Sequence, residues 1–116
     1  MHPDLTALQG VDEFDRLLGE SKARPVLLFK HSRSCGISME ALDEIVTHLN
    51  EGPTEAQYAM VTVQTHRAVS NEVASRLGIR HETPQALLLR NGRVVWSASH
   101  FRVTAAAVEQ AIKNQS

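Results

Sequence analysis

Two apolar runs joined by an Asn-Gly dipeptide constrain the fold of this chain most strongly. The runs cover residues 86–89 and 94–96, and Asn91 and Gly92 lie between them. Asn-Gly favours the positive φ angles of a tight turn, and such a turn joins strands that are antiparallel neighbours. The sequence therefore predicts a β-hairpin in the C-terminal half of the chain.

Helical and strand patterns alternate through the remaining sequence. Helical spacing of apolar residues runs through residues 11–20, 35–49 and 70–77, and Thr104 can cap a last helix. Apolar or β-branched runs at residues 26–29 and 58–63 predict strands, and the first lacks alternation, as a strand covered on both faces does. Residues 5–8 form at most a short edge strand. The expected fold class is α/β, a central mixed sheet of about four strands with helices on both faces.

Composition limits the domain count and the partners. The chain has 116 residues, a formal net charge of −1 and one cysteine. This length suits one domain, which we place at residues 1–116. The balanced charge argues against a nucleic-acid or anionic-membrane partner, and no stretch approaches the roughly 20 apolar residues of a membrane span. We therefore expect a cytoplasmic protein.

Cys35 is the main candidate for chemistry. It lies between the buried strand at residues 26–29, followed by a polar loop at 31–34, and an amphipathic helix. A helix start presents unpaired N–H groups and a partial positive charge, which favour the reactive thiolate form of a cysteine. Arg33 and His31 could add positive potential, and Ser38, one turn on, could offer its hydroxyl to the sulfur. Ser38 cannot form a disulfide.

Blander interpretations stand beside this one. A free cysteine is most often an ordinary buried small residue, and Cys-x-x-Ser alone is weak evidence of function. A metal site formed by His31 and Cys35 is weaker still, because no second cysteine follows at ligand spacing. We expect no metal.

Pro84 supplies a second, independent signal. It follows Thr83 and precedes the strand at residues 86–89, so the Thr83–Pro84 bond could be cis. If the strands assemble as predicted, this loop lies at the same end of the sheet as Cys35, where its backbone could pair with an extended substrate. The plainer alternative is a proline that merely starts a strand.

Together these elements resemble the thioredoxin superfamily over about residues 11–114. Residues 83–94, Thr-Pro-Gln-Ala-Leu-Leu-Leu-Arg-Asn-Gly-Arg-Val, look like its segment of cis-proline, apolar strand and Asn-Gly hairpin. In the thioredoxin Cys-x-x-Cys motif the nucleophile matches Cys35 and the resolving position is Ser38. Thioredoxins carry a buried acid six residues before the nucleophile, where this chain has Phe29, so dithiol proton shuttling is not expected.

Within that superfamily the chain most resembles the YtxJ-like monothiol bacilliredoxins of the bacillithiol system. Phe29-Lys30-His31-Ser32 leading into Cys35-Gly36-Ile37-Ser38 carries the likeness, with Ser34 and Gly36 where the family motif Thr-Cys-Pro-Ile-Ser has Thr and Pro. The resemblance implies a thiol-disulfide oxidoreductase that removes bacillithiol, or another small thiol used as co-substrate, from protein mixed disulfides. Its catalytic residues would be Cys35 and Ser38, and its substrate-binding residues Thr83, Pro84, Arg33 and Gly36.

Two other classes remain open. Monothiol glutaredoxins share Cys-Gly-x-Ser and hold an iron–sulfur cluster, but they have Phe at the position of Ile37 and a diglycine after the cis-proline strand, which is missing here. A non-catalytic module that binds partner peptides beside Pro84 is the other alternative. The sequence does not identify the small thiol, the protein substrates or the reductant.

Overall fold

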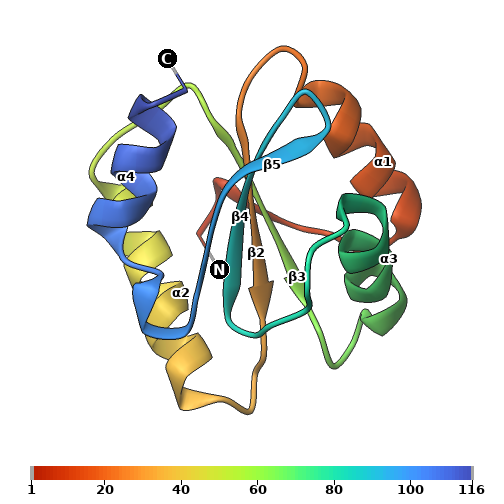
Figure 1. Ribbon diagram of the computed structural model, residues 1–116. Coiled ribbons are helices and arrows are strands. Elements are labelled where there is room, and N and C mark those ends of the chain that lie inside the picture. Colours follow the sequence, from red (N-terminus) through yellow and green to blue (C-terminus); the bar gives the residue numbers. More distant parts are fainter. Residues whose placement is uncertain (1, 116) are drawn as a thin grey trace.

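A computed structural model describes residues 2–115, and five strands of this range form one mixed sheet with helices on both faces (Figure 1). The elements in chain order are β1 (Leu5–Ala7), α1 (Val11–Glu20), β2 (Val26–His31), α2 (Gly36–Asn50), β3 (Gln57–Thr62), α3 (Arg67–Leu77), β4 (Gln85–Arg90), β5 (Arg93–Ser99), the 3₁₀ turn η1 (His100–Arg102) and α4 (Ala105–Lys113). The α/β class is confirmed. The strand count is five, because Leu5–Ala7 pairs with β3 as the short edge strand that the sequence allowed.

The strand β2 lies at the centre of the sheet, whose order is β1-β3-β2-β4-β5. It runs parallel to β3 and antiparallel to β4, and every one of its residues is buried. Burial on both faces explains why the apolar run at residues 26–29 shows no alternation.

The strands share their side chains between two cores. In Figure 1, α2 and α4 cover one face of the sheet and α1 and α3 cover the other. The first core includes Leu27 and Phe29 of β2 packed with residues of α2 and α4, and the second includes Val26 and Leu28 packed with residues of α1 and α3. The predicted face of the last helix is confirmed, since Val108, Ala111 and Ile112 are buried in the first core.

The Asn-Gly hairpin forms as predicted. Asn91 and Gly92 have φ angles of 55° and 73°, the left-handed values that a tight two-residue turn requires. Their N–H groups donate to the carbonyl and hydroxyl oxygens of Ser21, at 2.9 Å and 2.8 Å. The turn is thereby docked on the end of α1, at the opposite end of the sheet from Cys35.

Several boundaries differ from the sequence prediction; β5, for example, extends to Ser99 rather than Trp96. We predicted a polar loop at residues 31–34, but His31 is the last residue of β2 and pairs with Thr62 of β3. The helix α3 begins at Arg67 rather than Ser70. The three added residues include Val69, which is buried in the second core one turn before Val73, whereas Arg67 and Ala68 are exposed. The helical spacing of Val69 and Val73 was therefore present in the sequence, whereas the apolar pattern of β2 does not mark the pairing of His31.

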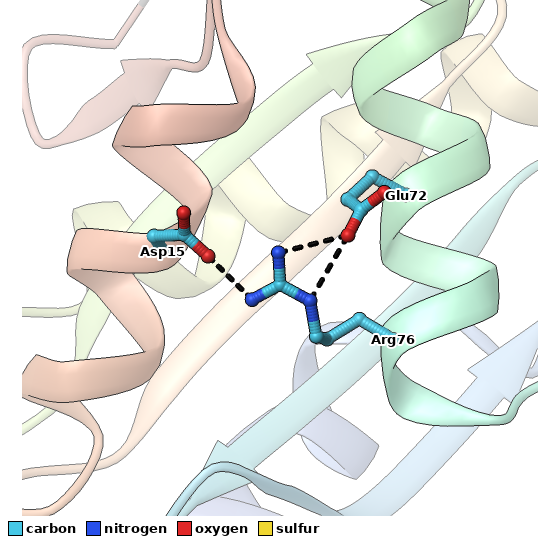
Figure 2. Close-up of polar contacts among 3 residues, drawn as sticks. All are labelled: Asp15, Glu72 and Arg76. Carbon is cyan, nitrogen blue, oxygen red and sulfur yellow. Dashed lines mark hydrogen bonds and ion pairs between the residues drawn. The ribbon is translucent and has the colours of Figure 1, made fainter.

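A charged contact joins α1 to α3 at the surface of the molecule. Figure 2 shows the Arg76 guanidinium between the carboxylates of Asp15 and Glu72, and the same group lies 5.6 Å from the centre of the Phe14 ring. Arg76 donates to Glu72 from Nε at 3.0 Å and from Nη2 at 2.8 Å. The contact links two helices that are separated in sequence by β2, α2 and β3.

Candidate active site

The Cys35 loop and the Thr83–Pro84 loop lie at the same end of the sheet. Lys30, near the end of β2, pairs with Gln85 at the start of antiparallel β4. The residues that follow β2 and those that precede β4 therefore leave the sheet together, and Figure 1 shows both loops at the same end of the molecule. The Thr83–Pro84 peptide bond is cis.

Cys35 occupies the N-cap position of α2 and is partly exposed. Its backbone is extended, with φ −113° and ψ 120°, and its carbonyl accepts the first helical hydrogen bond from the N–H of Met39 at 3.1 Å. The N–H groups of the first helical turn have no acceptor within the helix and point towards this end. Within residues 2–115 the thiol has no hydrogen-bond partner, so its sulfur is available for reaction.

The Ser38 hydroxyl does not bond to the sulfur, contrary to the sequence expectation. Ser38 is 0% exposed, its Oγ shares a hydrogen bond of 2.9 Å with Nδ1 of His31, and it accepts the N–H of Ser32 at 2.9 Å. The hydroxyl therefore ties the first turn of α2 to the end of β2. It fixes the direction in which Cys35 leaves the strand rather than touching the reacting atom.

His31 does not add the positive potential that its proximity in sequence suggested. Its side chain is buried, and this desolvation, together with the nearby charge of Arg33, lowers the pKa of the imidazole from its usual 6.5. The ring is therefore neutral at pH 7. Its function in the structure is to hold Ser38.

Gln64 is a residue of this site that the sequence analysis missed. It lies between β3 and α3, and its side-chain amide donates to the hydroxyls of Ser32 at 2.7 Å and Ser34 at 3.0 Å. Its carbonyl oxygen accepts the N–H of Arg33 at 3.2 Å. One side chain thus holds three consecutive residues before Cys35. No local pattern marks Gln64, because its partners are about 30 residues away in sequence.

Thr83 is the one residue of the 80–84 loop without a hydrogen bond to other described residues. Its neighbours are all held: the side chain of Gln85 donates to the Arg80 carbonyl at 3.0 Å, and His100 donates its N–H to the Pro84 carbonyl at 3.1 Å. Nδ1 of His81 lies 2.6 Å from Nζ of Lys30, and the carboxylate of Glu82 accepts the hydroxyl of Ser99 at 2.8 Å. The loop is fixed on both sides of a free, partly exposed backbone amide and carbonyl.

Arg33 and Gly36 flank Cys35 on the surface. The Arg33 side chain is exposed, and within the described chain its guanidinium forms no ion pair. A Cβ atom at Gly36 would meet nothing within 4 Å, and the backbone there is helical, so glycine is not required by its conformation. Among residues 2–115, no three His, Cys, Asp or Glu side chains come together as metal ligands. Over the same range, every helix is too short or too polar to cross a membrane.

Solved structures share this fold. A protein with a thioredoxin fold, proposed to be an oxidoreductase, is 30% identical, with a TM-score of 0.83 over 93% of each chain. The thioredoxin of Fasciola hepatica is 16% identical, with a TM-score of 0.76 over 96% of this chain and 99% of its own. A mutant thioredoxin of Halobacterium salinarum is 23% identical, with a TM-score of 0.73 over 98% of this chain and 93% of its own. The last two show the fold alone, and together with the first they confirm the predicted thioredoxin fold.

A family model resolves the class further. The model described as monothiol bacilliredoxin BrxC matches residues 6–108, a range that contains Cys35, Ser38, Thr83 and Pro84. This match, with the thioredoxin fold and a partly exposed thiol at a helix start, supports thiol redox chemistry. The chain belongs to the monothiol bacilliredoxin family.

Proposed function

We propose that this protein removes a low-molecular-weight thiol of the bacillithiol type from cysteines of other proteins, with Cys35 as nucleophile. The observation that carries the proposal is the position of Cys35, which is partly exposed at the start of α2 and lies at the same end of the sheet as the free backbone of Thr83. An accessible sulfur suits both attack on a disulfide and later departure from one.

The reaction is a thiol-disulfide exchange. The Cys35 thiolate attacks the small-thiol sulfur of the mixed disulfide, the disulfide bond breaks, and the substrate protein leaves as a thiolate that takes up a proton. Cys35 is then joined to the small thiol. Because the chain contains no second cysteine, a second small thiol or a reductase must attack this new disulfide and return Cys35 to the thiolate.

The surrounding residues would bind the substrate. The free N–H and C=O of Thr83 would pair with the backbone of an extended segment that carries the modified cysteine, with Pro84 next to it in the loop. Arg33 and Gly36 would contact the small thiol or the substrate from the other side of Cys35, and Ser38 would act by holding the turn. Such chemistry fits the reducing cytoplasm, with mixed-disulfide proteins and the small thiol as partners.

Release of thiol from a purified protein mixed disulfide tests the proposal. The substrate is prepared once with bacillithiol and once with glutathione, and a small-thiol reductant is supplied in excess. We expect turnover by the wild-type protein, faster with bacillithiol, and none by Cys35→Ser. Ser97→Ala, an exposed change on β5, is the matched control and should retain full turnover. Full activity in Cys35→Ser would refute the assignment, and specific binding of the substrate without turnover by the wild type would favour a binding module.

A further inference from the structure

Lys30 is a buried cation in the strand that leads to Cys35. It is 0% exposed. Because every second residue of a strand points to the same face, Lys30 shares its face with Val26 and Leu28, which pack in the core beneath α1 and α3. Burying a charged amine is costly unless it is hydrogen-bonded, and an apolar side chain would fill this position at lower cost. Within residues 2–115, Lys30 has no acidic partner.

The Lys30 ammonium donates hydrogen bonds to two acceptors. Its Nζ lies 2.6 Å from Nδ1 of His81, in the loop before Pro84, and 3.5 Å from the carbonyl oxygen of Ser70 in α3. An ammonium only donates, so Nδ1 of His81 must be the acceptor and the ring must be neutral, with its proton on Nε2. Burial lowers the pKa of Lys30 to about 8. Burial, Lys30 and Arg67 lower the pKa of His81, against the opposing effect of Glu82.

His81 lies two residues before Thr83. Three other hydrogen bonds hold this loop. Gln85 of β4 donates to the carbonyl of Arg80, and Ser99 of β5 donates to the side chain of Glu82. His100, the residue after β5, donates its N–H to the carbonyl of Pro84. The bond to Lys30 is the attachment that joins the loop to β2, the strand that also ends beside Cys35. Lys30 thus connects the two loops of the site through the interior.

We infer that Lys30, acting through His81, is a positioning residue that holds the Thr83 backbone in register with Cys35 for binding of the substrate protein. The inference rests on the proposed function, which it deepens: it concerns how the mixed-disulfide protein is held and not how the sulfur reacts. Loss of the Lys30 bond should therefore weaken substrate binding while the intrinsic reactivity of Cys35 is unchanged.

The test compares four variants. Lys30→Met keeps the length and removes the donor, whereas Lys30→Arg keeps a donor. His81→Ala removes the acceptor, whereas His81→Asn retains one. We expect Lys30→Met and His81→Ala to raise KM for a protein mixed disulfide about threefold to tenfold, the range of a single ordinary hydrogen bond, with kcat within about twofold. His81→Asn should return KM towards the wild-type value, and the rate of Cys35 alkylation by iodoacetamide should stay within about twofold throughout.

A nuclear magnetic resonance measurement makes the test independent of turnover. In Lys30→Met, the backbone order parameter of Thr83 should fall below the value of about 0.85 that is typical of rigid segments, and the imidazole of His81 should titrate at higher pH. His81 is exposed, so its variants serve if a change at buried Lys30 prevents folding. The inference would be overturned if the order parameter at Thr83 were unchanged in both Lys30→Met and His81→Ala. It would also be overturned if the rate of Cys35 alkylation fell by the same factor by which KM rises. If the wild type turns over no mixed disulfide while Thr83 still loosens, the proposed function fails and the positioning role of Lys30 stands.

Discussion

Hydrogen bonds of Ser38 and Gln64 fix the turn in which the sulfur of Cys35 is presented. The Ser38 hydroxyl shares a hydrogen bond with the imidazole of His31 and accepts the N–H of Ser32. The side chain of Gln64 bonds to Ser32, Arg33 and Ser34, the three residues before Cys35. The thiol itself is left out of this network and is free to react. Specific polar partners, rather than close packing, therefore define the geometry of the nucleophile.

Replacement of Ser38 by Ala should be destabilising. It leaves a buried imidazole nitrogen and a backbone N–H without partners, and each such loss costs about 1–3 kcal/mol. The free energy of unfolding, measured by urea denaturation, should fall by about that amount for one or both groups. The exposed change Ser97→Ala should alter it by less than about 0.5 kcal/mol. An equal effect of the two substitutions would show that the Ser38 bonds do not hold the turn.

Gly36→Pro should stabilise the protein. Position 36 is the first residue of α2, its N–H has no acceptor within residues 2–115, and Cys35 is extended, as the residue before a proline must be. Restricting the unfolded chain at such a site contributes about 0.4–1 kcal/mol. Gly78→Pro is the matched opposite, because Gly78 has a φ of 63° that proline cannot adopt, and it should be destabilising. Thermal melts of both variants check the signs, and a lower Tm for Gly36→Pro would contradict this description of the turn.

The bounds of some helices and strands could be predicted from the sequence, and those of others could not. Helix α1 has the predicted bounds, and the Asn-Gly turn is correct, because local spacing and turn chemistry decide both. The extension of β2 through Lys30 and His31 could not be predicted. These polar residues are buried because His81 and Ser38 satisfy them, and a pattern read along the strand contains neither partner. The position of Cys35 was predictable in the same way as α1, whereas its supports Gln64 and Lys30 were not.

The contact of α1 with α3 should depend on salt. Arg76 bridges Asp15 and Glu72 on the surface, where ionic screening weakens charge pairs, although its packing on Phe14 is unaffected by salt (Figure 2). Arg76→Ala should lower Tm, and the difference from wild type should shrink in 1 M NaCl, but not vanish. Lys113→Ala removes one exposed pair within α4, with Glu109, and should have a smaller effect. A loss for Arg76→Ala that does not change with salt would mean that packing alone joins the two helices.

At the scale of the whole molecule, histidines whose pKa is lowered in the folded chain, the buried His31 and His48 and the exposed His81, make stability depend on pH. Burial is the largest cause of the lowered pKa at His31, His48 and His81. The unfolded chain takes up protons near the ordinary pKa of 6.5, before the folded chain does, so protonation favours unfolding. The stability contributed by the neutral rings is fully present above pH 6.5 and is lost as the pH falls below it.

Urea denaturation across pH 5 to 8 checks this prediction. The free energy of unfolding should decrease from pH 7 towards pH 5. His48→Gln removes one of the buried rings, the one that bonds to the Tyr58 hydroxyl at 2.7 Å, and should make the decrease shallower. A stability that rises on acidification over this interval would contradict neutral buried histidines.

The central claim, that Cys35 itself accepts the small thiol, is tested most directly by intact mass after a single turnover. The protein is mixed with one equivalent of a protein carrying a bacillithiol mixed disulfide, without reductant, and the reaction is quenched with acid. We predict that the chain gains the mass of one bacillithiol while the substrate protein loses it, and that Cys35→Ser gains nothing. A substrate that loses its bacillithiol while Cys35 stays unmodified, or a chain that instead becomes linked to the substrate protein, would contradict the account.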